Sequence, residues 1–361
     1  MSKSLILRKS YLLIAGLFMF CGYSQSVRKY SNEFLNIGVD AAAFGMANAV
    51  TASTDDVNSV YWNPAGLINI EDNQFAAMHA NYFANIATYN YVAGAMPIDE
   101  KSAVGLSMIR FGVDDIMNTT QLIDSQGNID YDRISLFSAA DYAFALTYAR
   151  KTGIEGLSLG ANAKVIRRVI GEFADAWGFG FDVGIQYHTG KWRFGAMARD
   201  VTTTYNTWTI NEAEFETISG AIDGQNQERP ETTEITLPKL QMGVARHFDL
   251  SKDFGLTTAV NLDFRFAQTN DIISSSNLSA TPAAGFEVNY TKMVFLRGGV
   301  GNFQEVEQLG GGAAMGFQPN FGVGFRYNGI QIDYAFTDIG DQSVALYSNI
   351  FSLKLDWSVF R

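Results

Sequence analysis

The sequence predicts an all-β protein, a 14-stranded antiparallel transmembrane β-barrel with a small N-terminal hatch or plug. Three observations lead to this prediction. Long segments alternate between apolar and small or polar residues, the connections between them alternate in length, and the chain opens with a typical secretory leader. A composition of 47% hydrophobic and 17% charged residues also excludes a disordered chain, because such chains are poor in apolar residues.

The charge of the chain argues against a nucleic-acid partner. The 361 residues include 26 Lys and Arg against 37 Asp and Glu, which gives a formal net charge of -11 at pH 7. Proteins that bind nucleic acid usually carry a basic surface that neutralises phosphates. We therefore expect no nucleic acid among the partners.

Residues 1–24 are predicted to be a secretory signal peptide. Basic residues lie within 3–9, an apolar run covers 11–20, and small residues precede a cleavage site before Gln25. The apolar run is too short to cross a bilayer as a helix, which takes about 20 residues. Cleavage would also remove Cys21, the only cysteine, and with it any disulfide, thiolate metal site or cysteine nucleophile.

Alternation with a period of two identifies the strands. From Trp177 to His188 every second residue is large and apolar, and the residues between are small or polar. The pattern returns from Phe351 to Val359. Transmembrane β-strands need about 9 to 11 residues, with an apolar side toward lipid and a polar side toward the lumen. The alternative, a large secreted β-protein, would bury the apolar side in a core and have more proline-rich turns.

Fourteen candidate strands follow from this pattern. They lie at approximately 74–82, 87–97, 102–112, 136–149, 156–168, 177–188, 192–201, 238–248, 255–267, 282–290, 293–301, 318–327, 329–337 and 346–359. From the second strand onward, short and long connections alternate. Outer-membrane barrels place short turns in the periplasm and long loops outside the cell. This parity predicts a multi-pass barrel of the cell outer membrane with both termini in the periplasm.

The longest connection, 202–237, is predicted to be an acidic surface loop that forms a partner-binding rim. Its carboxylates are Glu212, Glu214, Glu216, Asp223, Glu228, Glu231 and Glu234, against a single base, Arg229. No Asp-x-Asp-x-Asp-Gly spacing marks a calcium loop, so a solvated loop is favoured over a calcium site. The candidate rim residues are Trp208, Glu212, Glu214, Phe215 and Glu216.

Residues 25–73 precede the first strand and are predicted to fold inside the barrel. Residues 40–50 are rich in alanine and favour a short helix or compact coil, and Asp55-Asp56 can cap the following turn. The motif Tyr61-Trp62-Asn63-Pro64-Ala65-Gly66-Leu67 places a turn among large apolar side chains, which need a partner to pack against. A barrel of 14 strands leaves space that its own side chains do not fill. The predicted domains are a signal peptide (1–24), a hatch (25–73) and a barrel (74–361).

Four stretches carry a resemblance to a known family: Lys29–Val39, Ala43–Met46, Asp55–Leu67 and Ile332–Asp341. On these residues the chain resembles the PorV/PorQ family, outer-membrane proteins of the Bacteroidetes related to the FadL-type fatty-acid channels. The resemblance extends over the whole chain and implies a fourteen-stranded barrel with an N-terminal hatch. The Trp-Asn-Pro-Ala-Gly-Leu form is closer to the broad family than to its best-studied secretion member, and no cargo-binding residue can be carried over.

The resemblance implies a role in type IX secretion, in which the barrel binds secreted cargo by its C-terminal signal domain and passes it from the translocon to the attachment machinery. The implied partners are a secretion-system barrel, cell-surface attachment proteins, secreted cargo proteins and outer-membrane lipid. The alternative is a FadL-like channel for uptake of hydrophobic small molecules. The polar loop 202–237 favours a protein-binding rim over an apolar entrance, although a charged rim would also suit solubility.

The sequence predicts no enzyme, no cofactor and no metal site. His79, His188 and His247 are far apart, each on or at the end of a predicted strand, so we expect them to fill space or face the lumen rather than hold a metal. Gly178-Phe-Gly180 and Gly322-Val-Gly324 lie inside strands rather than at a strand-to-helix turn, so they are not phosphate loops. We expect these glycines to face a packed hatch.

Overall fold

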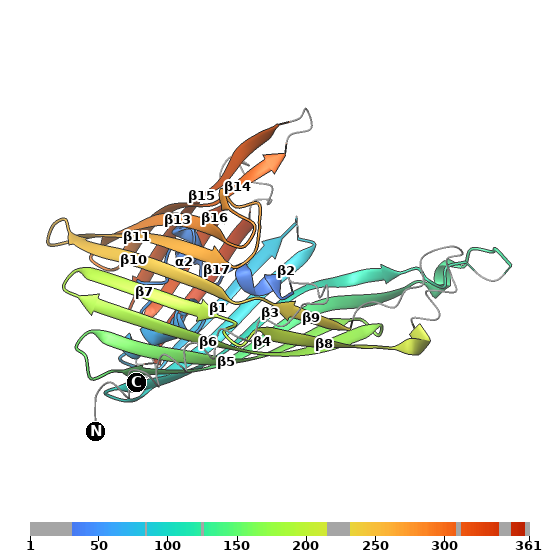
Figure 1. The fold of residues 1–361 in the computed structure, drawn as a ribbon, viewed down its shortest axis with the longest axis horizontal. Helices are drawn as coiled ribbons and strands as arrows, with labels where there is room; N and C mark the ends of the chain where they lie inside the picture. The colour runs from blue at the N-terminus through green and yellow to red at the C-terminus, as the bar shows by residue number, and fades with distance from the viewer. Residues whose placement is uncertain are drawn as a thin grey trace, which may run out of the picture.

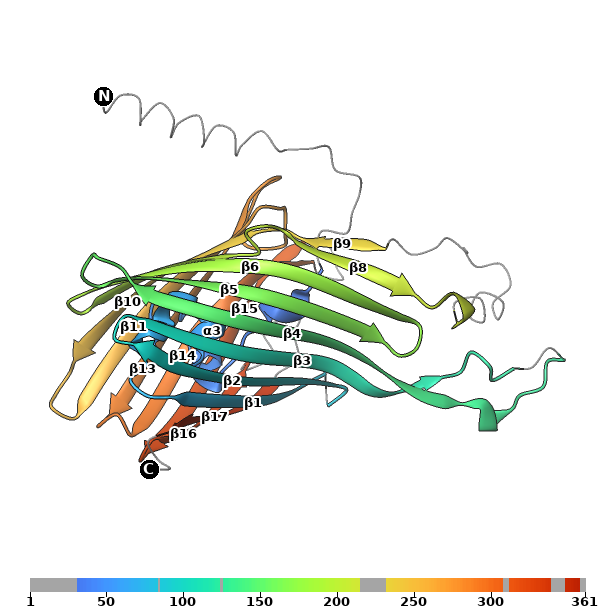
Figure 2. The same ribbon diagram turned by 90° about the horizontal axis from the view of Figure 1, so that it is seen from below.

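The computed structural model describes residues 31–83, 85–123, 126–214, 232–307, 312–338 and 348–357. The predicted signal peptide and the rim residues Phe215 and Glu216 lie outside these ranges. The described chain forms a closed antiparallel β-barrel around an N-terminal segment (Figure 1), and a view turned by 90° shows the same segment between the walls (Figure 2). No helix in the described part is long and apolar enough to cross a membrane.

Fourteen strands close the barrel, each paired antiparallel with its neighbours. They are β1 (Gln74–Tyr82), β2 (Ala87–Asp99), β3 (Ser102–Asn118), β4 (Ser135–Lys151), β5 (Leu157–Ile170), β6 (Ala174–Thr189), β7 (Trp192–Arg199), β10 (Lys239–Asp249), β11 (Phe254–Arg265), β13 (Ser279–Tyr290), β14 (Val294–Glu307), β15 (Ala313–Tyr327), β16 (Ile330–Thr337) and β17 (Ser348–Asp356). The last strand pairs with the first, from Gln74 opposite Asp356 to Asn81 opposite Asn349. Closure pairs the backbone N–H and C=O groups that edge strands would leave free. A sheet in lipid requires this, because no water is available there to bind those groups.

Each of the fourteen predicted strands corresponds to one of these, and the alternation of connections defines the two ends of the barrel. We call the end with turns such as 100–101, 190–191 and 328–329 the short-turn end, and the opposite end the long-loop end. Several strands run farther toward the long-loop end than predicted, and β3 continues to Asn118. In the extension of β3, Val113-Asp114-Asp115-Ile116-Met117-Asn118, apolar and polar residues do not alternate, so the pattern that identified the strands is absent there.

Three further strands extend the wall without adding to the circuit: β8 (Thr204–Ile210), β9 (Thr233–Thr236) and β12 (Ile273–Ser274). Both β7 and β8 pair with β6, so they form one strand that is interrupted at 200–203. Asp200 and Thr203 have positive φ angles of 52° and 59° in this interruption. The prediction that 202–237 is entirely loop is therefore wrong, because β8 and β9 continue the backbone ladder.

The two faces of the wall alternate as predicted. In β6 the side chains of Trp177, Phe179 and Phe181 are exposed on the outer face, and the residues between them are buried. A continuous apolar outer surface is the property of a barrel that is solvated by lipid. His79 of β1 departs from the prediction, because it is on the outer face, where Nδ1 lies 2.7 Å from Asn90 Oδ1.

Residues 31–73, which we call the hatch, cross the barrel lumen. They form η1 (Glu33–Asn36), α2 (Ala41–Gly45), α3 (Ser59–Trp62) and η2 (Pro64–Asn69). Ser31 lies 2.9 Å from Thr236 of β9, on the long-loop side of the interruption, whereas the Asn73 carbonyl accepts a 2.8 Å hydrogen bond from the Trp357 N–H at the short-turn end. The hatch therefore runs from the long-loop side to the short-turn end. Both Asn73 and Trp357 lie at the end predicted for the termini, and Ser31 does not.

The core of the molecule lies between the hatch and the inner wall. Val39, Val57, Val60 and Leu67 of the hatch are at most 1% exposed. Wall glycines allow this close approach: a Cβ at Gly160 would lie 2.5 Å from Ala65 N, and one at Gly322 would lie 3.0 Å from Gly45 Cα. Hatch and wall are thus packed backbone to backbone.

Of the four glycines predicted to face the hatch, one does so, and Gly324 lies instead against Asp333 and Arg297 of the wall. Gly322 packs against the hatch as predicted. Gly178 and Gly180 instead leave room for Asn206 and Thr204, whose side chains lie over the inner face of β6. The period of the sequence shows that these glycines face inward but cannot show which segment covers them.

Candidate functional site

The hatch motif Tyr61–Leu67 is buried throughout its length. Two of its aromatic residues bind earlier parts of the hatch: the Tyr61 hydroxyl donates to the Leu35 carbonyl at 2.6 Å, and the Trp62 indole N–H donates to the Val39 carbonyl at 3.0 Å. The elements of the hatch have at most six residues, so they are too short to be stable as isolated helices. The motif therefore folds the hatch onto itself as well as filling the lumen.

Asn63 joins the motif to the barrel wall. Its side-chain amide nitrogen donates to the Thr51 carbonyl at 3.0 Å and to the Ile185 carbonyl of β6 at 3.1 Å. Its Oδ1 accepts from Ala65 N at 3.2 Å, which caps η2, where Pro64 occupies the first position. Asn63 therefore connects a turn, a loop of the hatch and the wall through one side chain.

Arg199 of β7 is the second buried connection. Its guanidinium donates to the Tyr61 carbonyl at 2.8 Å, to Gln241 Oε1 at 2.7 Å and to the Leu35 carbonyl at 3.3 Å, and it lies 4.3 Å from the centre of the Tyr61 ring. The sequence analysis missed this residue. The alternation of the strand shows that Arg199 points inward, but its hydrogen-bond partners lie in segments far away in the sequence, so they could not be predicted.

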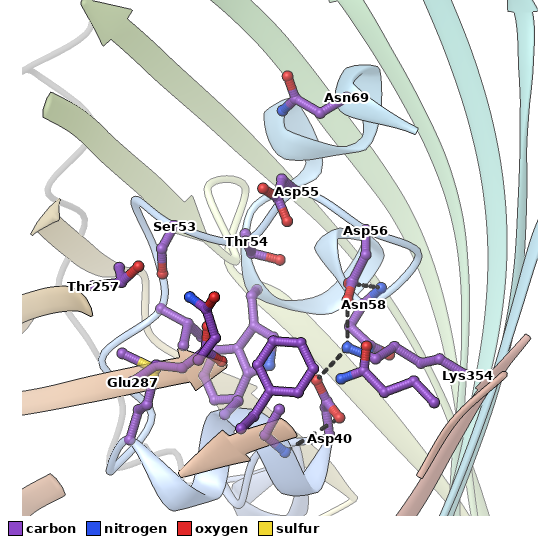
Figure 3. A pocket seen from close by; sticks show the side chains of 18 of the residues that line it. Asp40, Ser53, Thr54, Asp55, Asp56, Asn58, Asn69, Thr257, Glu287 and Lys354 are labelled. Carbon is purple, nitrogen blue, oxygen red and sulfur yellow. Dashed lines mark hydrogen bonds and ion pairs between the residues drawn. The ribbon is translucent and has the colours of Figure 1, made fainter. Parts of the chain in front are cut away.

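Electrostatic attraction also holds the hatch. Its charged residues are all acids, namely Glu33, Asp40, Asp55, Asp56, Glu71 and Asp72, and it contains no lysine or arginine. The wall supplies the cations: Lys354 Nζ lies 2.7 Å from Asp56 and 3.6 Å from Asp40, and Arg193 lies 2.7 Å from Asp55. Figure 3 shows Lys354 between the two aspartates. The hatch therefore supplies the negative charges of these ion pairs, and the wall supplies the positive charges.

Asp40 is the most constrained of these acids. Its backbone has a positive φ of 72°, and its carboxylate caps α2 by accepting from Ala42 N at 3.3 Å. Ser352 of β17 donates its hydroxyl to the same carboxylate at 2.8 Å. Burial raises the pKa of Asp40, and the positive charge of Lys354 opposes that rise.

A cavity of about 810 Å³, which we call the vestibule, opens at the short-turn end (Figure 3). The hatch lines it with Asp55, Asp56 and Asn58, and the wall lines it with Arg193, Glu287 and Lys354. Asn58 is 2% exposed, and both polar atoms of its amide lack a partner among the described residues. The vestibule is thus polar and suits water and polar solutes.

An apolar patch lies in the lumen on the opposite side of the hatch. Tyr82, Tyr89 and Phe111 contact one another, with ring centroids 6.4 Å apart for Tyr82 and Tyr89 and 6.0 Å apart for Tyr89 and Phe111. Ile37 of the hatch, Tyr82 and Phe111 are partly exposed and pack against the hydrophobic core. We call these four residues the aromatic patch. Hence the long-loop side of the hatch carries an apolar patch as well as charged wall residues such as Arg168 and Asp141, whereas the vestibule on the short-turn side is polar and charged.

Three of the five predicted rim residues, Trp208, Glu212 and Glu214, lie in the described part of the chain. Trp208 lies on β8, where the Arg168 guanidinium stacks 5.1 Å from its ring, and Arg168 also pairs with Asp141 and Glu234 at 2.8 Å. Glu212 is exposed and Glu214 is half-buried. Trp208 therefore belongs to a network of ion pairs at the long-loop end, and the role of the rim in binding partners stays a prediction.

Metal-binding chemistry finds no support in the described ranges. No group of three or more histidine, cysteine, aspartate or glutamate side chains there could hold a metal ion. His247 Nδ1 lies 3.1 Å from Thr257 Oγ1 and Nε2 lies 3.2 Å from Asp249, so this imidazole takes part in local polar contacts.

Solved structures of membrane channels share this fold. The CymD monoaromatic hydrocarbon channel is similar with a TM-score of 0.55 and 12% identity, over 89% of this chain and 98% of that one. The toluene transporter TodX of P. putida has a TM-score of 0.52 and 12% identity, over 88% and 98%. A FadL homologue of Pseudomonas aeruginosa has a TM-score of 0.50 and 12% identity, over 88% and 98%.

No protein-family model matches the chain, and none of the curated proteins matches it significantly. At 12% identity the structural likeness shows a common fold. The chain is thus an outer-membrane-type β-barrel of fourteen antiparallel strands, with structural neighbours among the FadL-family channels.

Proposed function

We propose that this chain is a non-enzymatic outer-membrane channel for hydrophobic small molecules. The observation that carries the proposal is the aromatic patch, which offers a partly exposed apolar surface in the lumen on the long-loop side of the hatch. The neighbours named as a monoaromatic hydrocarbon channel and a toluene transporter support the same substrate class. In this proposal the long-loop end faces the outside of the cell.

In the proposed channel the aromatic patch receives the ligand and the hatch controls passage. Transfer of an apolar molecule from water to the surface formed by Ile37, Tyr82 and Phe111 is favourable, because it removes apolar surface from water. The hatch then separates this ligand from the vestibule, because its backbone touches the wall at Gly160. Passage requires the hatch to shift relative to the wall.

The test is uptake of radiolabelled toluene and oleate by cells that lack their own channels of this type. Cells expressing the wild-type chain should take up at least one compound faster than cells with an empty vector. Phe111→Asp should abolish the gain, because it places a carboxylate in the aromatic patch, and Phe111→Leu should retain it. Glu71→Gln at the vestibule is the control that leaves uptake unchanged. Uptake at the empty-vector level by the wild type would overturn the proposal.

A second candidate function is protein binding at the cell surface. Beyond the barrel wall β3 and β4 continue as a two-stranded arm (Figure 1), in which Asn118 pairs with Ser135. The arm exposes Met117, Tyr131 and Leu136 at 68%, 72% and 61%. Exposed apolar clusters of this kind often mark protein interaction sites. This observation favours the secretion component implied by the PorV/PorQ resemblance.

The two candidates differ in what accompanies the protein. We suggest gentle detergent extraction of the tagged chain from its native outer membrane, followed by mass spectrometry of proteins and lipids. Secretion barrels and cargo with a shared C-terminal domain would support the second candidate, and an apolar ligand in an otherwise pure sample would support the channel. Replacing Met117 and Leu136 by serine should remove the protein partners and leave a bound ligand in place.

A further inference from the structure

Arg246 of β10 faces outward, near the short-turn end of the barrel. Its strand neighbours Ala245 and Gly243 face the hatch, whereas Met242 and Val244 are exposed. In the ladder Arg246 is directly opposite Trp192 of β7, which is 41% exposed. Side chains opposite each other in a ladder share a face, so Arg246 lies on the outer surface with Trp192.

Two aromatic rings fix the position of this guanidinium. Its central carbon lies 4.8 Å from the centre of the Trp192 ring and 4.7 Å from that of Phe248. Trp192 stacks on Phe194, and Phe194 stacks on Tyr187, which makes an aromatic row at this level of the barrel. Aromatic rows of this kind lie at the level of lipid headgroups.

Arg246 lacks the polar partners that similar arginines in this chain have. Its side chain forms no ion pair or hydrogen bond with the described residues, and its Nε is buried without a partner there. Two other outward-facing arginines lie over a ring of the same wall, and each has a carboxylate: Arg167 pairs with Asp175 at 3.5 Å, and Arg110 pairs with Asp114 at 2.6 Å. Arg246 is therefore a positioned cation without its anion.

We propose that Arg246 forms a binding site for the phosphate of an anionic phospholipid. The planar guanidinium presents several N–H groups that match phosphate oxygens, and the flanking rings offer an apolar surface to the adjoining lipid. An anionic headgroup such as phosphatidylglycerol has a net negative charge and no ammonium to compete for the phosphate, so it is preferred over a zwitterionic one. The site requires that the barrel lies in a lipid bilayer, and it does not depend on transport.

The test is native mass spectrometry of the purified full chain in detergent with equimolar dioleoyl phosphatidylglycerol and dioleoyl phosphatidylethanolamine. The wild type should retain phosphatidylglycerol in preference. Arg246→Met should lower that retention roughly tenfold, the factor that corresponds to about 1.4 kcal/mol. Arg246→Lys, which keeps the charge but loses the planar donors, should fall between them.

Arg167→Met is the matched control. It removes an outward arginine that stacks on Trp177 at 4.7 Å but already has a carboxylate, so phosphatidylglycerol retention should stay within about twofold of wild type. Equal retention of the two lipids by the wild-type chain would overturn the proposal. Unchanged retention in folded Arg246→Met would do so as well. Folding is checked by heat-modifiable migration on gels, and methionine is tolerated on a lipid-facing position.

Discussion

At the residue scale, single polar side chains carry most of the connection between hatch and wall. Asn63, Arg199 and Lys354 each contact two or more separate segments. A buried polar atom that loses its partner costs about 1–3 kcal/mol, and a buried charge costs more. Substitutions at these positions should therefore loosen the hatch without preventing the barrel from closing.

We expect Lys354→Met to release the hatch locally. The substitution leaves Asp40 and Asp56 facing each other without the cation between them, and breaking a buried ion pair costs about 3–5 kcal/mol. Hydrogen exchange followed by mass spectrometry should show faster exchange of hatch peptides from 40 to 62, while the barrel strands keep their protection.

Lys191→Met is the matched control for this substitution. Lys191 also forms a 2.7 Å ion pair, with Asp249, but both side chains are more than half exposed. Exposed pairs contribute only about 0–1 kcal/mol, so hatch exchange should not change. Equal exchange rates in the Lys354 variant and the wild type would show that the cation does not hold the hatch.

At the scale of elements, the hatch depends on the shape of the wall. None of its helical turns is long enough to stand alone, so each must fit against strands that carry small residues at the contact. Gly160 of β5 and Gly195 of β7 are such contacts, because a Cβ there would overlap hatch backbone atoms. Neither glycine has a positive φ, so the backbone conformation does not require glycine there. What requires it is the close approach of the hatch backbone to the wall.

Gly160→Ala should displace η2. The added methyl group would lie 2.5 Å from Ala65 N, and backbone cannot move aside as a flexible side chain can. Overpacking typically costs about 1–3 kcal/mol. The midpoint of thermal unfolding of the hatch, followed by Trp62 fluorescence, should fall. Gly153→Ala, where a Cβ meets nothing within 4 Å, is the control, and equal midpoints for the two variants would contradict the packing described above.

Deleting Tyr61 to Leu67 tests the hatch as a closure. The deletion removes Asn63 and the ring under Arg199, so the remaining hatch loses these contacts to β6 and β7. We expect a protein that still inserts and migrates as a folded barrel but lets large antibiotics through. Cells expressing it should become sensitive to vancomycin. Permeability like that of the wild type would sink the assignment of these residues as the plug.

At the scale of the whole molecule, the barrel and the hatch are held by different interactions. Fourteen backbone ladders close the barrel, whereas the hatch is attached by side-chain hydrogen bonds, ion pairs and packing. Proteins open in units whose free energies differ, and a unit without a ladder opens first. The hatch is therefore the part that can move while the barrel remains closed.

Rising urea should open the pore before it unfolds the barrel. In planar bilayers we expect conductance steps to appear at a urea concentration where the heat-modifiable gel band of the folded barrel is still intact. The steps should reverse when urea is removed. If conductance changes only where the folded band is lost, the hatch and the barrel unfold as one unit, and the separation of the two would be wrong.

Much of the fold could be predicted from the sequence, but only a smaller part of the candidate site could. The alternation around Trp177 located the strands because one face of each must be apolar toward lipid. It missed β8, where each face mixes polar residues with an aromatic one, Tyr205 outside and Trp208 inside. The motif at Tyr61 identified the buried segment, but neither Arg199 nor Lys354 was identified as its partner, because nothing local distinguishes these bases from others that face the lumen.

By itself the sequence determined the barrel circuit, the inward and outward faces and the presence of an N-terminal segment that needs burial. These properties follow from local chemistry, since strand period and turn residues act over a few positions. Only the tertiary structure decided that the hatch crosses the lumen from Ser31 to Asn73, that its acids meet cations of the wall, and that Arg246 lies against two rings with no carboxylate partner among the described residues. Those contacts join residues up to hundreds of positions apart, and closure of the sheet brings them together.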